Sequence, residues 1–342
     1  MKQPVTTNLL LNDHLSVHDI GENDIFKEPL LLQIGFNKTA TTFLYELYSC
    51  FTNTVTIQGS AYNEFNYFVD YVVYTPDEEF DVKTARVLFI IGVNAVPSKR
   101  CDIFMHESLT FRYYNFFNQN RVVTRLSKIF LKSKVLIGTR NQCDWLVSHW
   151  GQYIRSGGLL NLKEFADLMI ARQNSDLRMT HFGYISQQMI ESFGEERVFI
   201  YDIESLKKSD LFIKKISRFL ENLPYKIHPM TNVNTAPSSF KLSLLRISNH
   251  LLRFDCGAHP YSFDEYETPN YILAKLFWKI RYFYKHVRLK ALNIPSELCR
   301  THNYLPNLEY NKQKLTQSQS DRINKIFHKS NNLLAKYLNR IQ

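Results

Sequence analysis

One stretch near the N-terminus decides the fold: Leu30-Leu31-Leu32-Gln33-Ile34-Gly35-Phe36-Asn37-Lys38-Thr39-Ala40-Thr41-Thr42. Its first five residues form an almost unbroken apolar run of strand length, which predicts a buried strand. The residues from Thr42 to Leu47 continue as a predicted helix. A buried strand that turns within a few residues into a helix is typical of a βαβ unit on a parallel sheet.

Further apolar runs of strand length follow along the chain: Val87–Ile91, Ile103–Met105, Val135–Gly138 and Val198–Tyr201. The first could equally be a buried helix, because periodicity alone does not separate the two for a short apolar run. Helices are expected from Leu162 to Phe193 and, amphipathic, from about Gln319 to Leu338. The pattern predicts an α/β fold with a P-loop-like parallel sheet flanked by helices and a C-terminal helical appendage.

Composition and charge narrow the class of protein. The 342 residues carry a formal net charge of +10, which favours encounter with nucleotides, acidic glycans, nucleic acid or an anionic membrane. The five cysteines lie far apart and in no CxxC or Cys/His arrangement, which argues for reduced thiols and against disulfides or a zinc site. The N-terminal residues lack the apolar core of a signal peptide, and no apolar stretch is long enough to cross a bilayer. We therefore expect a cytoplasmic protein.

The loop between the first strand and its helix has the features of an anion site. A chain that leaves a buried strand and enters a helix presents unpaired N–H groups and the positive end of the helix dipole. Lys38 adds a mobile charge, and the hydroxyls of Thr39, Thr41 and Thr42 add donors. The loop is not a Walker A motif, because Lys38 follows Gly35 by three residues instead of preceding the helix directly after a second glycine. The plainer interpretation is a helix start with threonine caps and a surface lysine.

A second candidate anion site follows the strand at Val135–Gly138. Arg140 emerges at the carboxyl end of this strand, where open α/β sheets bind ligands, and Ser148 lies about two turns into the next predicted helix. A guanidinium fork with a nearby hydroxyl suits a phosphate monoester. The alternative is a local ion pair between Arg140 and Asp144 at the start of that helix.

These two stretches together resemble the donor-binding motifs of sulfotransferases that use 3′-phosphoadenosine 5′-phosphosulfate (PAPS), in particular the bacterial and glycan-modifying type. Ile34 to Leu44 is similar to the family's 5′-phosphosulfate loop, G-x-P-K-T/S-G-T-T-W/F-L, with Asn37 in place of proline and Ala40 in place of glycine. Glycine at the latter position would allow a positive φ or close approach of the donor. The resemblance implies that the donor's phosphosulfate contacts the loop residues Gly35, Asn37, Lys38, Thr39, Ala40, Thr41 and Thr42.

The segment from Val135 to Trp150 is similar to the family's second motif, strand-x-x-R-N-P-x-D-R-x-x-S-x-Y. The resemblance implies that Arg140 and Ser148, eight residues apart, hold the donor's 3′-phosphate. Gln142, Trp145 and Trp150 replace the usual proline, arginine and tyrosine. Further along, Tyr184 occupies a position that could contact the adenine. The resemblance covers roughly residues 28 to 235 well and the remainder weakly.

The catalytic groups follow from the needs of sulfuryl transfer: an acceptor held in line, a base for its proton and positive charge at the leaving oxygen. Lys38 can supply the charge. The base is expected among His106 and Glu107, which end the predicted strand Ile103–Met105, and the resemblance favours Glu107. The alternative is that His106 is a core residue and Glu107 a solvated carboxylate at a helix start. No metal is expected, because PAPS is the only co-substrate that the resemblance implies.

The predicted organisation has four parts: an N-terminal extension (1–28), a PAPS-binding sulfotransferase core (29–230), a helical acceptor-side or membrane-proximal insertion (231–310) and a C-terminal helix packed on the core (311–342). Residues 271–290 carry six basic residues and no acid among aromatics and leucines. This segment could contact an anionic membrane surface or an acidic glycan, or it could bury its aromatics against the core. The expected acceptor is a carbohydrate, a lipid-linked saccharide or another small molecule.

Other functions fit the sequence less well. A P-loop kinase needs a Walker A lysine and a Mg²⁺-binding acid, and neither is evident. A nucleic-acid-binding protein would use the positive charge, but the basic residues are scattered and no helix-turn-helix, zinc finger or RNP motif occurs, so we expect no nucleic-acid partner. A homologue that binds the nucleotide without catalysis remains an alternative because of Ala40.

Overall fold

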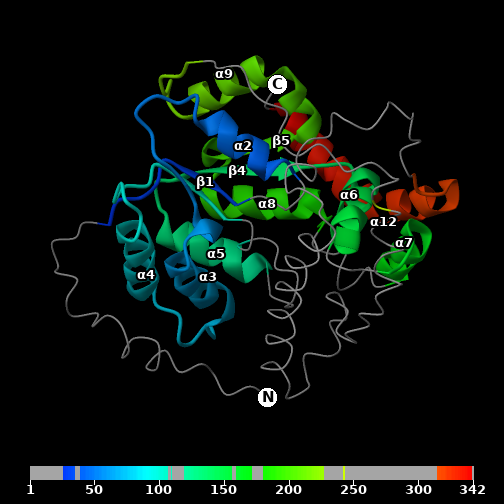
Figure 1. The fold of residues 1–342 in the computed structure, drawn as a ribbon, viewed down its shortest axis with the longest axis horizontal. Coiled ribbons are helices and arrows are strands. Elements are labelled where there is room, and N and C mark those ends of the chain that lie inside the picture. The colour runs from blue at the N-terminus through cyan, green and yellow to red at the C-terminus, as the bar shows by residue number, and fades with distance from the viewer. Residues whose placement is uncertain are drawn as a thin grey trace, which may run out of the picture.

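The computed structural model describes residues 26–34, 39–106, 109, 119–155, 159–171, 180–226, 242 and 314–340 (Figure 1). Five strands form a sheet in the order β2-β3-β1-β4-β5, and every neighbouring pair is parallel. The strands are β1 (Leu31–Gln33), β2 (Thr56–Gln58), β3 (Ile103–Met105), β4 (Lys134–Thr139) and β5 (Val198–Asp202). The predicted parallel α/β sheet is confirmed.

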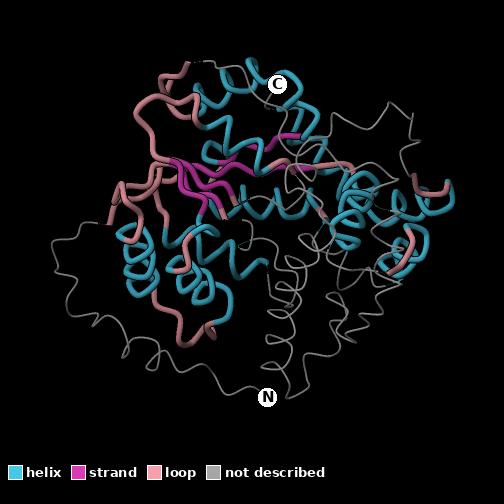
Figure 2. The backbone as a smooth tube through the Cα atoms, in the orientation of Figure 1, coloured by secondary structure: helices cyan, strands magenta, loops and turns pink. Residues whose placement is uncertain are grey.

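Helices cover both faces of this sheet (Figures 1 and 2). The helices are α2 (Thr41–Tyr48), α3 (Glu64–Tyr74), α4 (Val82–Asn94), α5 (Gln119–Ile129), α6 (Gln142–Arg155), α7 (Leu162–Ala171), α8 (Phe182–Phe193), α9 (Ser209–Phe219) and α12 (Gln317–Arg340), with 3-10 turns at Gly59–Ala61, Glu195–Arg197 and Ile203–Lys208. In Figure 1, α2 and α9 lie above the strands, and α3, α4, α5 and α8 lie below them.

The two faces of the sheet bury separate cores because successive strand residues point to opposite sides. On β1, Leu31 packs into the core under α2 and α9, whereas Leu32 packs into the larger core under α3, α4, α5 and α8. Leu136 and Phe199 continue the first core along β4 and β5. A strand that is buried on both faces reads as a continuous apolar run, which is why β1, β4 and β5 could be predicted from the sequence.

The connections that follow the parallel neighbours β1 and β4 lie on different faces of the sheet. After β1 it enters α2 in one core, and after β4 it enters α6, whose Trp145 and Leu146 belong to the other core. The connections therefore leave these two neighbouring strands toward opposite faces. In open α/β sheets such a switch point leaves a crevice outside the carboxyl ends of the strands, and ligands bind there.

One predicted strand is wrong. The apolar run Val87–Ile91 lies inside the helix α4, which was the alternative for this run. The helix begins with a side-chain cap, because Asp81 accepts hydrogen bonds from the backbone N–H and the hydroxyl of Thr84. Residues such as Ala85, Leu88 and Phe89 then face the core at helical spacing.

The strand β2 was missed, because only Ile57 of its three residues is buried.

The segment from Leu162 to Phe193 is not one helix. α7 and α8 are separate, and Thr180 and His181 between them are not α-helical. The predicted C-terminal helix is confirmed as α12, which packs against α8, α6 and α7. Of the predicted helical appendage, 231–310, only Leu242 lies in the described part, and it is buried in the larger core. The segment 271–290 lies outside the described residues.

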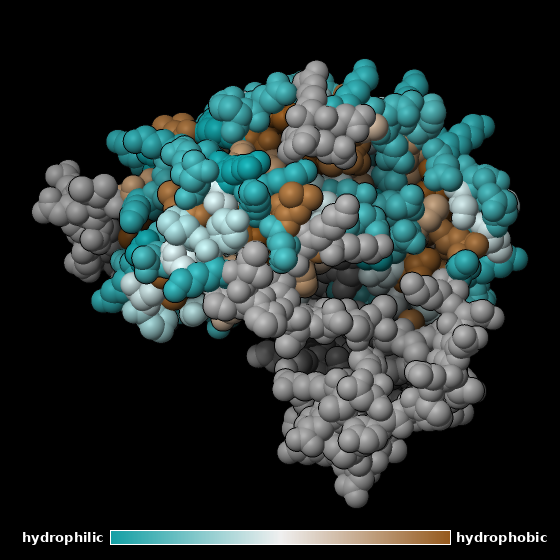
Figure 3. Space-filling view, turned by 90° about the horizontal axis from the view of Figure 1, so that it is seen from above, coloured by the Kyte–Doolittle hydropathy of each residue, from teal (hydrophilic) through white to brown (hydrophobic). Residues whose placement is uncertain are grey.

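The surface formed by the described residues mixes hydrophilic and hydrophobic side chains. In Figure 3, hydrophobic residues lie in small groups among hydrophilic ones on the face seen from above. Tyr45 of α2 and Leu211 of α9 are among the exposed large hydrophobic residues. Among the helices that the structure describes, none combines the length and hydrophobicity needed to span a bilayer.

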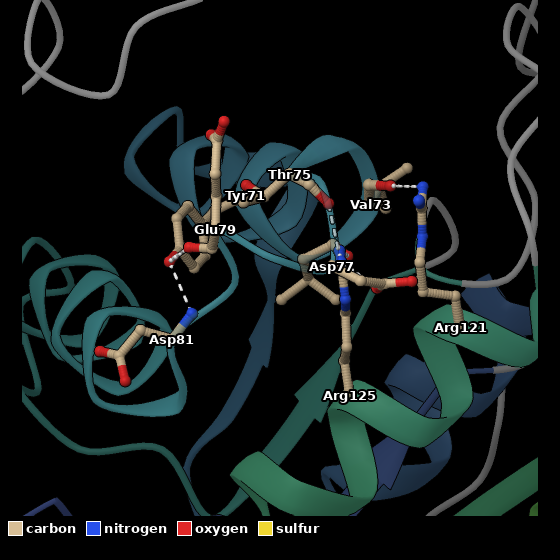
Figure 4. A network of polar contacts seen from close by, with 9 residues as sticks. Tyr71, Val73, Thr75, Asp77, Glu79, Asp81, Arg121 and Arg125 are labelled. Carbon is tan, nitrogen blue, oxygen red and sulfur yellow. Dashed lines mark hydrogen bonds and ion pairs between the residues drawn. The ribbon is translucent and has the colours of Figure 1, made fainter. Parts of the chain in front are cut away.

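Arg125 of α5 is the buried charge that ties α5 to the end of α3 (Figure 4). Its guanidinium donates to the carbonyls of Val72 (2.8 Å) and Thr75 (2.7 Å) and to the carboxylate of Asp77 (2.6 Å). Burial lowers the pKa of Arg125, which the hydrogen bond to Asp77 counteracts. The side chain of Arg125 is 4% exposed, whereas that of Asp77 is 73% exposed.

We expect Arg125→Leu to lower the free energy of unfolding by about 2–3 kcal/mol, because it removes charge-assisted bonds and leaves two carbonyls without them. Asp77→Ala is the matched control: it removes only the exposed partner and should cost under about 1 kcal/mol. Urea denaturation of both variants measures the two values. Equal losses in the two variants would contradict the assignment of the stabilisation to the carbonyl contacts.

Candidate anion site at the strand ends

Three neighbouring strands end at the candidate site. β1 lies between β3 and β4, with Gln33 opposite both Met105 and Leu136. His106 follows β3, and Arg140 follows β4. Thr39 and Ala40 precede α2, the helix that follows β1. The structure thus brings His106, Thr39–Thr42 and Arg140 to one edge of the sheet, at the switch point. Gly35, Asn37, Lys38 and Glu107 lie outside the described residues, so their positions remain predictions.

Ala40 adopts the left-handed conformation that the usual glycine would favour. It is the N-cap of α2, with φ 65° and ψ 34°, and its carbonyl accepts the first helical hydrogen bond, from Leu44 N at 3.0 Å. A non-glycine residue pays about 1–2 kcal/mol for this conformation. Alanine therefore holds a conformation that glycine would hold without strain, and contacts around the turn have to offset the strain. N–H groups in the first turn of α2, such as that of Thr42, have no acceptor within the helix.

The turn before α2 is anchored from the far side of β4. Thr39 is fully buried, and its carbonyl accepts a hydrogen bond of 2.9 Å from the hydroxyl of Tyr201 on β5. The backbone carbonyl of Tyr201 in turn accepts from the hydroxyl of Thr139 at 2.9 Å. This connection between β5 and the turn was not expected from the sequence.

Arg140 sits partly buried among carboxylates. Burial lowers its pKa, and the charges of Asp144, Glu204 and Asp202 act in the opposite direction. Asp202 ends β5 opposite Thr139, and burial raises its pKa. A phosphate at Arg140 would therefore compete with these acids for the guanidinium. Sequence reasoning missed Asp202, although its place at the carboxyl end of a predicted strand was the available signal.

Asn141 provides the side-chain cap at the start of α6, the place where an ion pair between Arg140 and Asp144 was the alternative expectation. Its side-chain oxygen accepts from the backbone N–H groups of Cys143 (2.9 Å) and Asp144 (3.3 Å). Asp144 lies exposed in the first turn. Ser148 is partly buried on the same helix, about 9 Å along the axis from Gln142. Whether Arg140 and Ser148 hold one phosphate stays a prediction.

The departures from the second motif have structural roles. Gln142 exchanges amide hydrogen bonds with Asn331 of α12, at 2.8 Å and 3.1 Å. Trp145 is buried and stacks on His149 at 4.5 Å between ring centroids. Trp150 donates its indole N–H to the carbonyl of Leu160 at 3.0 Å. These contacts within the protein hold α6 in place.

His106 is enclosed by the protein. It is 3% exposed, and its backbone N–H donates to the carbonyl of Gln33 at 3.2 Å. The ring lies against Gly59, where a Cβ atom would approach its Cδ2 to 2.7 Å. The candidate base at this position is thus a well-packed histidine at the end of β3, one residue before the undescribed Glu107.

Tyr184 lies in the first turn of α8. It is 46% exposed and stacks on His181, with ring centroids 5.4 Å apart. An exposed ring fixed by a neighbour suits a flat ligand such as a purine base. Within the described ranges, no group of three or more His, Cys, Asp or Glu side chains is arranged to hold a metal ion.

Comparison with known proteins finds similar chains among solved structures. No protein-family model matches the chain, and no curated protein matches its sequence. Among solved structures, 18 chains match. One is a sulfotransferase from Alicyclobacillus acidocaldarius, which has a TM-score of 0.43 and 14% sequence identity and aligns over 68% of this chain and 96% of its own.

Proposed function

We propose that this protein is a sulfotransferase that moves the sulfuryl group of PAPS to a hydroxyl or amine of an acceptor, with a carbohydrate or lipid-linked saccharide as the acceptor class. One observation carries the proposal. The segment Thr39–Thr42, which leads into α2, follows β1, and Arg140 follows the neighbouring strand β4. The two therefore lie on the two sides of the switch point. A nucleotide with an anionic group at each end fits an edge that has two separate anion-binding elements.

The roles follow from the chemistry of the transfer. Thr41 and Thr42, with Lys38, would hold the phosphosulfate at the start of α2, where the dipole and the first-turn N–H groups favour anions. Arg140 and Ser148 would hold the 3′-phosphate, and Tyr184 would lie against the adenine. The loop contacts would fix the reacting groups in line, so that most of the rate comes from positioning and charge stabilisation.

In the transfer step, the acceptor oxygen attacks sulfur while Glu107 or His106 removes its proton. A new S–O bond to the acceptor forms, and the bond between sulfur and the 5′-phosphate oxygen breaks. The electron pair of the broken bond stays on the phosphate, where Lys38 offsets the developing charge. The products are the sulfated acceptor and adenosine 3′,5′-bisphosphate. No metal takes part in this proposal.

Thermal unfolding with added ligands tests the donor site. Adenosine 3′,5′-bisphosphate should stabilise the protein, by about 2.7 kcal/mol at a concentration a hundred times Kd, because it binds only the folded state. ATP with Mg²⁺ and duplex DNA are the comparison ligands and should give smaller shifts. A larger shift with ATP and Mg²⁺ would favour a kinase, and a larger shift with DNA would favour a nucleic-acid-binding protein. Either result would overturn the proposal.

Transfer itself and the acceptor class need a second assay. Donor labelled with ³⁵S, incubated with cell-envelope fractions, should label saccharide-containing material.

We propose a cytoplasmic enzyme whose segment 271–290 contacts anionic lipid at the membrane surface. Flotation with liposomes that contain or lack anionic lipid tests that contact, and flotation that does not depend on lipid charge would end the membrane part of the proposal.

A further inference from the structure

Tyr201 reaches across a whole strand to contact the turn before α2. It belongs to β5, and the strand order places β4 between β5 and β1. Its hydroxyl nevertheless donates a hydrogen bond of 2.9 Å to the carbonyl of Thr39, in the connection that follows β1. This contact joins two parts of the chain that are 162 residues apart in the sequence.

Gly138 makes this reach possible. It lies directly opposite Tyr201 in the register of β4 and β5. A Cβ atom on Gly138 would come within 2.3 Å of the Tyr201 hydroxyl, 2.5 Å of Cζ and 2.9 Å of the Thr39 hydroxyl. A side chain at this position would thus occupy the space through which the phenol passes, so only glycine leaves the path open.

The phenol is held rigidly in this path. Tyr201 is 2% exposed, and its ring packs edge-on against Phe212 of α9, with centroids 5.3 Å apart. The backbone at Tyr201 is fixed separately by the hydrogen bond from Thr139. The donor in the bond to Thr39 is therefore preorganised, and its position does not depend on the turn that it contacts.

The turn, in contrast, is strained. Ala40 follows Thr39 directly and holds a left-handed conformation that alanine disfavours. A residue keeps such a conformation only when surrounding contacts determine it. The carbonyl of Thr39 belongs to the peptide unit that leads into Ala40, so the bond from Tyr201 fixes one side of the strained residue.

We propose that Tyr201 is a positioning residue for the anion site at the start of α2. Its hydrogen bond holds Thr39 and Ala40 in the shape that directs the backbone N–H groups of Thr41 and Thr42 toward a bound phosphate or sulfate group. Gly138 contributes to this positioning, because its lack of a side chain leaves space for the phenol of Tyr201. The assignment rests on the proposed function in naming a nucleotide as the ligand, and it concerns binding and not bond cleavage.

Tyr48→Phe provides a matched control within the same core. Tyr48 is also a buried tyrosine under this face of the sheet, and its hydroxyl donates to the side-chain oxygen of Gln33 at 2.7 Å. Removing this hydroxyl deletes a buried hydrogen bond to a side-chain oxygen, whereas the bond of Tyr201 goes to the backbone of the turn. If Tyr201 contributed to stability alone, Tyr201→Phe would lower the affinity for the ligand no more than Tyr48→Phe does.

The experiment measures the affinity for adenosine 3′,5′-bisphosphate by calorimetry, alongside urea denaturation. Tyr201→Phe should weaken binding about tenfold, which corresponds to the loss of one hydrogen bond near the ligand. Tyr48→Phe should keep the affinity within about twofold while losing comparable stability. In an Ala40→Gly background, Tyr201→Phe should cost only about threefold, because glycine takes the left-handed conformation without support.

Inorganic pyrophosphate is the second probe, because it requires the anion site and no nucleoside contacts. If Tyr201→Phe and the parent protein bind both probes equally, the assignment of Tyr201 is overturned. Equal loss of affinity in Tyr201→Phe and Tyr48→Phe overturns it too. If the parent protein binds pyrophosphate in a Tyr201-dependent manner but not the nucleotide, the positioning role stands and the proposed function falls. If it binds neither probe, both fall.

Discussion

Arg140→Ala is expected to weaken binding of adenosine 3′,5′-bisphosphate roughly 30- to 150-fold, because a charge-assisted hydrogen bond contributes about 2–3 kcal/mol. Arg140 stands at the end of β4, and burial makes its charged form costly when no anion is near. The three acids around it supply part of the compensation in the free protein. Arg140→Lys keeps the charge but loses the planar fork, and it should bind about tenfold more weakly than the parent.

Arg322→Ala is the control for the loss of one positive charge. Arg322 lies on α12, is 54% exposed and pairs with Asp167 at 3.7 Å. Its replacement should leave the affinity within about twofold, because exposed pairs contribute little. Titration calorimetry of the three variants at one ionic strength measures these differences. An Arg140→Ala variant that binds as tightly as Arg322→Ala would remove Arg140 from the site.

Gly183→Ala is expected to lower the free energy of unfolding by about 3 kcal/mol or more, because overpacking at a rigid contact forces backbone shifts. Gly183 lies in α8 where α12 crosses it. A Cβ atom would stand 1.9 Å from the carbonyl oxygen of Ser330 and 2.9 Å from the nitrogen of Leu334. The backbone N–H of Gly183 also donates to the Ser330 hydroxyl at 3.0 Å. The close approach leaves no room for a methyl group.

Gly151→Ala tests the same substitution where space allows it. Gly151 lies in α6, and among the described residues its added Cβ would meet Leu242 alone, at an ordinary distance of 3.6 Å. Alanine is favoured over glycine inside a helix by about 0.8–1 kcal/mol, so this variant should be more stable than the parent. Urea denaturation compares the two variants. Opposite signs are expected, and a Gly183→Ala variant as stable as the parent would contradict the tight crossing of α8 and α12.

The sequence predicted the centre of the sheet well because local composition reflects burial there. Both faces of β1, β4 and β5 are covered, which leaves short apolar runs bounded by polar residues. The same reasoning failed at Val87–Ile91, because a continuous apolar run fits a strand and a buried helix equally. The edge strand β2 gave no signal, since one buried residue in three sets no pattern.

In the candidate site, too, features set by neighbouring residues could be predicted, and contacts between distant residues could not. The left-handed Ala40 could be suspected from the glycine it replaces, and the start of α2 could be read from its threonines. The contact of Tyr201 with Thr39 could not be predicted, because it depends on the order of three strands and on Gly138 between them. The same holds for the pair Gln142 and Asn331, which are 189 residues apart.

The contact between α6 and α12 has a consequence during synthesis of the chain. Gln142 at the start of α6 has its amide partner on Asn331, 189 residues later. At about 5–20 residues per second, a ribosome takes roughly 10–40 s to add that length. Throughout this interval the nascent chain contains β1, β2, β3, β4 and Arg140, but the start of α6 lacks its partner on α12. The start of α6 therefore reaches its final packing late, after residues 317–340 have left the exit tunnel and docked.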